Sequence, residues 1–86
     1  MPQISRFFGI TIYMYFNDHL PPHFHAEYGE HESVYTIDTL ETLRGGLPRR
    51  AHGLVLEWAA LHRNELRDNW QLARRMEPLI DIDPLD

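Results

Sequence analysis

The sequence predicts an α+β fold in a single domain spanning residues 1–86. In the first half of the chain, β-branched and aromatic residues alternate with period two; in the second half, apolar residues recur at three- and four-residue steps. We expect a three- to four-stranded antiparallel meander, packed on one face against a long C-terminal helix or helix pair. The expected strands cover about residues 10–16, 23–28, 32–38 and 40–44, and the helical part covers about residues 48–76.

The expected strands are bounded by residues that favour turns. Pro21 and Pro22 lack backbone donors, so the segment from Asn17 to Pro22 is expected to be a loop; each X–Pro bond in it is trans by default, with the cis form left open. Gly29-Glu30 suits a tight hairpin turn, and Gly45-Gly46 is expected to end the last strand.

A single apolar stripe predicts that the helical part lies across the sheet. Pro48 suits the first helical turn, Gly53 and Asn64 favour a kink or break, and Pro78 is expected to stop the helix. The tail from residue 79 alternates apolar and acidic residues, so it either adds an edge strand or stays mobile. The stripe consists of Ala51, Leu54, Val55, Trp58, Leu61, His62, Leu66, Trp70 and Ala73, with both tryptophans as core anchors and His62 at the core margin.

Composition narrows the classes of function. The chain has no cysteine, which excludes disulfides and thiolate metal sites, and it has no apolar run long enough for a membrane span. We therefore expect a cytoplasmic protein. The net charge of −5 disfavours nucleic-acid binding by the whole surface, but seven of the eight arginines lie within residues 42–76, which keeps RNA or an acidic partner open.

Histidines gather around the double proline, with His19, His23 and His25 within seven residues. If Phe16 pairs with Phe24, one set of alternating residues from the first two expected strands shares the core face: Ile12, Met14, Phe16, Phe24, Ala26 and Tyr28. Burying the imidazoles under the helix instead would cost several kcal/mol, which favours the first register. That register places Tyr13, Tyr15, His25 and Glu27 on the outer sheet face, with His19 and His23 on the adjoining loop.

Three interpretations of this cluster stay open. His19, His23, His25 and Glu27 can supply ligands for a divalent metal such as zinc, and no other cofactor is expected. Alternatively, His23 and His25 act as acid and base in RNA cleavage, beside Tyr13 and Tyr15, with Arg6 or Arg44 stabilising the developing charge. The third interpretation is structural, with the histidines as polar residues of a hairpin in a small binding protein.

Three segments carry a resemblance to a known family: residues 1–10, residues 14–25 with the run Asn-Asp-His-Leu-Pro-Pro-His-Phe-His, and residues 55–63. They resemble domain-of-unknown-function family 4160, although members often have a proline where this chain has Leu20. The resemblance implies a bacterial protein encoded beside a member of family 2442, in a pair similar to a type II toxin–antitoxin operon. It therefore implies the toxin-like component and a small cognate protein as partner. It supplies no catalytic residues, and a homodimer and RNA remain open as further partners.

Overall fold

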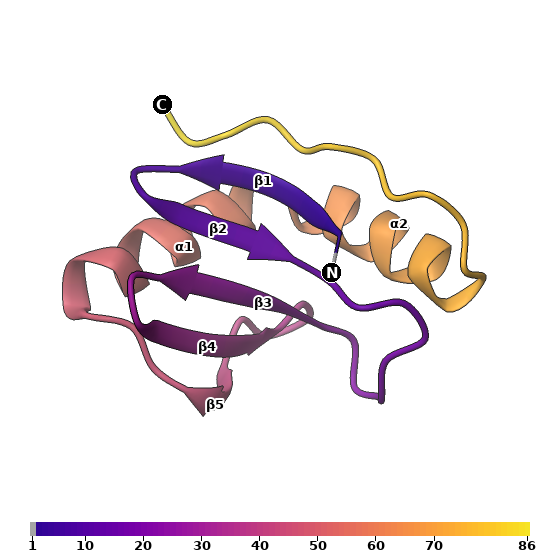
Figure 1. Cartoon of the computed structure of the whole chain (residues 1–86), viewed down its shortest axis with the longest axis horizontal. Helices are drawn as coiled ribbons and strands as arrows, with labels where there is room; N and C mark the ends of the chain where they lie inside the picture. The colour runs from indigo at the N-terminus through magenta and orange to yellow at the C-terminus, as the bar shows by residue number, and fades with distance from the viewer. Residues whose placement is uncertain (1) are drawn as a thin grey trace.

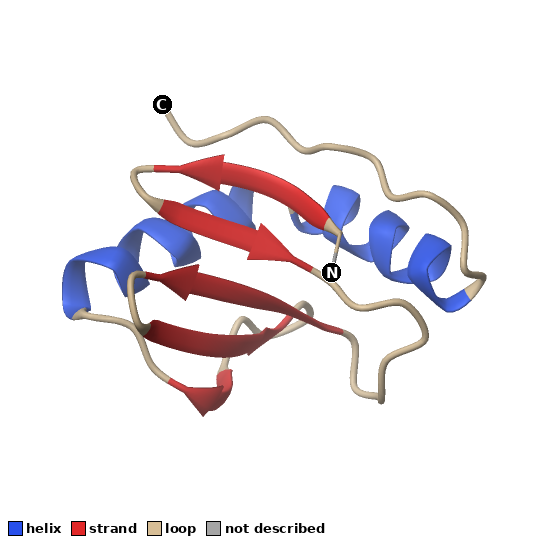
Figure 2. Cartoon of the chain, viewed as in Figure 1, coloured by secondary structure: helices blue, strands red, loops and turns tan. Residues whose placement is uncertain are grey.

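Residues 2–86 are described by a computed structural model with a five-stranded antiparallel sheet and two helices. Figure 1 shows the strands following one another across the sheet in chain order, and Figure 2 shows both helices behind it. The expected α+β meander is thus confirmed, with one strand more than the three to four expected; of the two alternatives for the helical part, the structure has the helix pair. The elements are β1 (Gln3–Phe7), β2 (Ile10–Tyr13), β3 (His23–Tyr28), β4 (His31–Thr36), β5 (Thr42–Gly45), α1 (Arg49–Leu61) and α2 (Arg63–Arg74).

Strand β1 is absent from the sequence prediction, and its burial pattern explains why. The pairing with β2 shifts between Gln3 and Ser5, which is a β-bulge. The bulge leaves Ile4 and Ser5 both buried, followed by buried Phe7 after one exposed residue. This pattern lacks the period-two alternation by which the other strands were predicted.

The register between β2 and β3 differs from the prediction by two residues. Ile12 lies opposite Ala26 and Tyr13 lies opposite His25, and β2 ends at Tyr13, so the expected Phe16–Phe24 pair does not form. An offset of two residues leaves every side chain on its predicted face, because side chains alternate with period two. Tyr13, His25 and Glu27 therefore share the face opposite the aliphatic core residues, as expected.

The connection from β2 to β3 is a long loop of residues 14–22. The backbone N–H of Asn17 donates to the carbonyl oxygen of Ala73 at the end of α2, 3.0 Å away, which ties the loop to the helix. Asn17 has a φ of 51°, a conformation that asparagine tolerates better than most residues. The Leu20–Pro21 peptide bond is cis. The expected register required residues 14–16 to continue the strand and pair with β3. In the structure the hydrogen bond between Asn17 and Ala73 holds this segment against α2 instead.

The helical part breaks at His62, which has φ −120° and ψ 25° and separates α1 from α2. The break lies two residues before Asn64, while Gly53 lies inside α1 without interrupting it. Trp58 and Trp70 are buried in the core as predicted, but Leu61 is 69% exposed and does not belong to the apolar stripe. Within residues 2–86, neither helix has the length and apolar character that crossing a membrane requires.

The C-terminal tail, residues 77–86, runs along β1 without forming a regular strand (Figure 1). The N–H of Ile82 donates to the carbonyl of Ile4 at 2.8 Å, and the Ile82 side chain is buried. Two further contacts hold the tail: the Trp58 indole donates to the Asp83 carbonyl at 2.8 Å, and the Asn69 amide bonds both the N–H and the carbonyl of Ile80. Of the two expectations for the tail, the edge-strand one is closer to the structure.

Candidate metal centre

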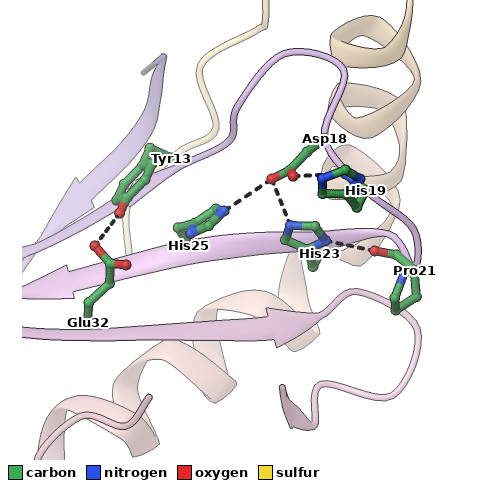
Figure 3. A network of polar contacts seen from close by, with 7 residues as sticks. All are labelled: Tyr13, Asp18, His19, Pro21, His23, His25 and Glu32. Atoms are coloured by element: carbon green, nitrogen blue, oxygen red, sulfur yellow. Dashed lines mark hydrogen bonds and ion pairs between the residues drawn. The ribbon is translucent and has the colours of Figure 1, made fainter. Parts of the chain in front are cut away.

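Two imidazoles and one carboxylate converge on the outer face of the sheet, at the end where β3 begins (Figure 3). Oδ2 of Asp18 lies 2.9 Å from Nε2 of His23 and 3.4 Å from Nε2 of His25. His23 and His25 alternate along β3, so both rings project to the same side of the strand. One ligand atom from each of the three residues lies within 4.8 Å of the other two. A single cation can therefore contact all three.

The loop orients the carboxylate of Asp18. Its Oδ1 atom accepts a hydrogen bond from the backbone N–H of His19 at 2.8 Å, the local bond that makes aspartate favourable in turns. This bond leaves Oδ2 facing the two rings. Burial raises the pKa of Asp18, but the bonds from the His19 backbone, His23 and His25 outweigh it, so the net pKa lies below its usual value. The carboxylate is therefore held in its charged form.

Each ring nitrogen of His23 lies within hydrogen-bond distance of an oxygen atom. Its Nδ1–H donates to the carbonyl oxygen of Pro21 at 2.7 Å, since a carbonyl can only accept. The neutral ring then carries a lone pair on Nε2, and this lone pair faces the carboxylate of Asp18. A lone pair and a carboxylate oxygen repel each other at this distance. The repulsion is removed when Nε2 carries a second proton or when both atoms bind the same metal ion. A histidine that binds a metal through one nitrogen commonly donates from the other to a backbone carbonyl, as His23 does here.

His25 is enclosed by aromatic rings. It stacks on Tyr13 with ring centroids 5.0 Å apart and an interplanar angle of 13°, and it meets Tyr15 edge-on at 4.8 Å. The residue is only 3% exposed, and its Nδ1 atom has no hydrogen-bond partner among residues 2–86. Burial lowers the pKa of His25, an effect that the nearby carboxylate of Asp18 only partly offsets. His25 is therefore held neutral, the form in which imidazole binds metal.

The distances can be compared with those of a metal site. Zinc bonds to nitrogen and oxygen ligands are about 2.0–2.2 Å long, which in a tetrahedral site places neighbouring ligand atoms roughly 3.4 Å apart. The separation of His25 Nε2 from the Asp18 carboxylate is 3.4 Å. The 2.9 Å contact of His23 with the same oxygen is a hydrogen-bond distance and would open by about 0.5 Å around an ion. Two of the three ligand pairs thus lie at or within about 0.5 Å of the separation expected in a zinc site, and the ligand atoms of the third pair, His23 and His25, lie within 4.8 Å of each other.

A hollow of about 280 Å³ opens beside the cluster, on the side of Asp18 and His23. The loop forms one wall of the hollow, and β4 and β5 form the other. Arg44 of β5 is the arginine in its lining. The complete lining is Asp18, His19, Leu20, Pro21, His23, Val34, Leu43 and Arg44.

Two residues of the predicted metal set lie outside the cluster. His19 is exposed and contributes its backbone N–H to Asp18, while its ring is not part of the converging group. Glu27 is half-buried two residues beyond His25 on β3 and is likewise outside the group. Asp18 takes their place. From the sequence, Asp18 was expected only as part of the loop from Asn17 to Pro22 and not as a ligand.

The residues predicted for acid–base catalysis are only partly assembled. Tyr13 and Tyr15 contact His25, but the Tyr13 hydroxyl donates to Glu32 at 2.7 Å, and burial together with Glu32 raises its pKa. Arg6 lies opposite Thr11 on β1 and lines a different hollow together with tail residues. Of the two arginines considered for stabilising charge, Arg44 is the one beside the cluster.

The geometry favours a metal over paired acid–base histidines. In RNA cleavage, the base acts on the attacking hydroxyl and the acid on the leaving oxygen, so the two imidazoles must lie on opposite sides of the phosphate. Here both Nε2 atoms face the same oxygen of Asp18, and His25 does not line the hollow. This arrangement suits one shared cation better than two separate proton transfers.

Two other histidines make structural contacts. His62 is half-buried, packs against Trp58 and bonds Glu65 at 2.5 Å, which agrees with its predicted place at the core margin. His52 of α1 stacks on Tyr35, and its Nδ1 atom lies 2.9 Å from the Tyr35 hydroxyl. The contacts of His62 join the end of α1 to α2, and those of His52 join α1 to β4. Neither histidine belongs to the cluster.

Comparison with known proteins supports the resemblance seen in the sequence. A family model described as a domain of unknown function, DUF4160, matches residues 9–71, which include β2 to β5, the loop with Asp18, α1 and most of α2. No curated protein sequence and no solved structure shows significant similarity to the chain. Since the matched residues make up more than half of its length, the chain belongs to the DUF4160 family.

Proposed function

We propose that this protein binds one divalent transition-metal ion through Asp18, His23 and His25. The observation that carries the proposal is the convergence of three ligand atoms within 4.8 Å. The hydrogen bond from His23 to Pro21 supports it, because it directs the Nε2 lone pair of His23 toward the centre of the group. The burial of His25 supports it further, because it lowers the pKa of this ring and so favours the neutral form that binds metals.

The donor set favours zinc or a similar borderline ion over magnesium. Imidazole nitrogen is a good ligand for zinc, iron, nickel and copper, whereas magnesium requires oxygen ligands in an octahedral shell. Three protein ligands leave at least one coordination position free. In zinc enzymes such a position holds water or substrate, and here the hollow beside Asp18 and His23 provides access to it.

Isothermal titration of the metal-free protein with zinc chloride tests the proposal. We expect binding of one zinc ion per chain, with no comparable heat from magnesium chloride. His25→Phe retains an aromatic ring between the tyrosines but lacks the ligand atom, so the zinc affinity should fall by at least roughly 100-fold.

The exposed histidines supply the controls for this titration. His31→Ala removes an exposed imidazole of β4 and should leave zinc binding unchanged, as should His19→Ala in the loop. Absence of zinc binding by the wild type would contradict the proposal. Equal affinity in the wild type and His25→Phe, with loss in His19→Ala, would place the ion elsewhere.

A second candidate function is the toxin-like component of a type II toxin–antitoxin-type pair, acting through a cognate protein or RNA. Its support is the family membership, together with a sheet edge that β5 leaves without a neighbouring strand among residues 2–86. Strand addition at such an edge is a common mode of protein binding.

Co-expression with the product of the neighbouring gene, followed by pull-down and size-exclusion chromatography, tests the partner. We expect a stable complex, and two separately eluting proteins would count against it. Induced expression of wild type and His25→Phe then tests whether the metal centre is involved. Growth arrest by the wild type alone would connect the two candidates, whereas equal arrest by both would separate toxicity from the ion.

A further inference from the structure

The hollow beside the metal centre has a distinct charge pattern. Among its lining residues, Asp18 is the only carboxylate and Arg44 is the only arginine. Arg44 is exposed and forms no ion pair within residues 2–86. With a divalent ion bound, the charge of Asp18 is more than neutralised, so two cationic centres face one hollow in a chain whose net charge is −5.

Sheet register fixes the position of Arg44 relative to the ion. Arg44 lies opposite Val34, and Val34 lies opposite His25, so the three form one row across β5, β4 and β3. Neighbouring strands are about 4.8 Å apart, which places the backbone of Arg44 roughly 10 Å from that of His25. Arg44 lines the same hollow as Asp18 and His23, two of the three proposed metal ligands. A small anion in this hollow can contact both Arg44 and the bound ion.

We propose that the hollow binds a phosphate group, with one phosphate oxygen on the free coordination position of the metal and another on the guanidinium of Arg44. The inference rests on the proposed metal binding and adds the class of ligand. Arginine matches phosphate geometry with paired donors, and divalent ions bind phosphate oxygens readily. The two cations together favour a dianionic or diester phosphate over a neutral ligand.

The rim of the hollow is apolar. Leu20 and Leu43 line it and are 64% and 48% exposed. These side chains offer a surface for the organic part of a phosphorylated molecule. The phosphate source is therefore either a nucleotide monoester or a phosphodiester of single-stranded RNA.

Binding to the zinc-loaded full chain tests the inference, after removal of excess zinc. The probes are adenosine 5′-monophosphate, a short single-stranded RNA without terminal phosphate, and adenosine as the ligand lacking phosphate. We expect at least one phosphate-bearing probe to bind the zinc-loaded protein by isothermal titration, and to bind the metal-free protein at least roughly tenfold more weakly. Binding of the monophosphate alone assigns a phosphomonoester, and binding of the RNA alone assigns a phosphodiester.

Arg44→Gln provides the decisive variant. It should retain wild-type zinc affinity and lose at least roughly tenfold in affinity for the phosphate probe. Arg50→Gln, at an exposed arginine of α1, is the matched control and should bind as the wild type does. Zinc binding without phosphate binding, equal affinity for adenosine, or an unchanged Arg44→Gln would overturn the inference while leaving metal binding intact. Failure to bind zinc would instead remove the proposed function and the inference with it.

Discussion

Nε2 of His23 lies 2.9 Å from Oδ2 of Asp18, which joins the first residue of β3 to the loop that precedes it. The other nitrogen of this ring is already bonded to the Pro21 carbonyl. The loop therefore has two contacts with one imidazole, and both fix the ring in an orientation suited to a metal ligand. The carboxylate in turn lies within reach of His25, so the geometry of the cluster depends on Asp18 as its common member.

Asp18→Asn should weaken zinc binding by at least roughly 100-fold, because the amide is a poor ligand for zinc and carries no charge. The amide oxygen can still accept the hydrogen bond from the His19 backbone, so the loop should keep its conformation. Asp38→Asn is the matched control, since Asp38 is exposed and, among residues 2–86, its ion pair is with Arg67 at the surface. Zinc titration of both variants, with circular dichroism to verify folding, distinguishes them; similar zinc affinities would rule Asp18 out as a ligand.

Gly45→Ala should destabilise the protein by about 1–3 kcal/mol. Gly45 has a φ of 73°, and a Cβ atom there would lie 2.1 Å from the backbone oxygen of Glu32. Gly46→Ala is the control on the adjacent residue, where a Cβ atom meets nothing within 4 Å. Urea denaturation of the two variants measures the difference. Equal midpoints would show that the β4–β5 pairing tolerates a side chain at Gly45.

Asn69→Ala should lower the free energy of unfolding by about 1–3 kcal/mol, because it removes the buried Asn69 amide and its two hydrogen bonds to the N–H and the carbonyl of Ile80. The tail along β1 should loosen, with faster amide hydrogen exchange at Ile82. Asn64→Ala, at an exposed position of the same helix, should change the stability by less than about 0.5 kcal/mol. Unchanged exchange at Ile82 in Asn69→Ala would mean that the tail is held by its other contacts.

Stability should decrease above pH 10 in part through Tyr35. Burial raises the pKa of this tyrosine above its usual value of 10.0. The folded state then retains the phenolic proton at pH values where the unfolded chain loses it, so its contribution is complete below pH 10 and is lost as the pH rises toward the folded pKa. Chemical denaturation from pH 8 to 11 should show a shallower decline for Tyr35→Phe than for the wild type. Parallel declines would exclude Tyr35 as a source of the pH dependence.

Much of the fold was predictable because most strands have regular alternation. The residues facing the core on β2 and β3 were predicted correctly, although the register was offset by two residues. Alternation in the sequence shows which face of the sheet a side chain occupies, but not which residue lies opposite it on the next strand. Strand β1 was missed because its bulge places Ile4 and Ser5 together in buried positions. The helix breaks at His62, whereas intrinsic propensity pointed to Gly53 and Asn64.

The candidate site was predictable only in part. Alternation within the expected strand 23–28 places His23 and His25 on one side, although the register argument put His23 on the adjoining loop; in the structure His23 is the first residue of β3. The position of Asp18 depends on the path of residues 14–22, which is set by the contact between Asn17 and Ala73 of α2. Arg44 reaches the site through the pairing of β4 with β5. Contacts between residues distant in sequence determine both, and no local pattern reveals them.

Metal binding at Asp18, His23 and His25 is tested most directly by diffraction from zinc-containing crystals of the full chain, recorded on both sides of the zinc absorption edge. We predict one anomalous peak about 2.0–2.2 Å from Nε2 of His23, Nε2 of His25 and a carboxylate oxygen of Asp18. Clear electron density for these three side chains without an anomalous peak between them, or peaks only at exposed histidines such as His19 and His31, would contradict it.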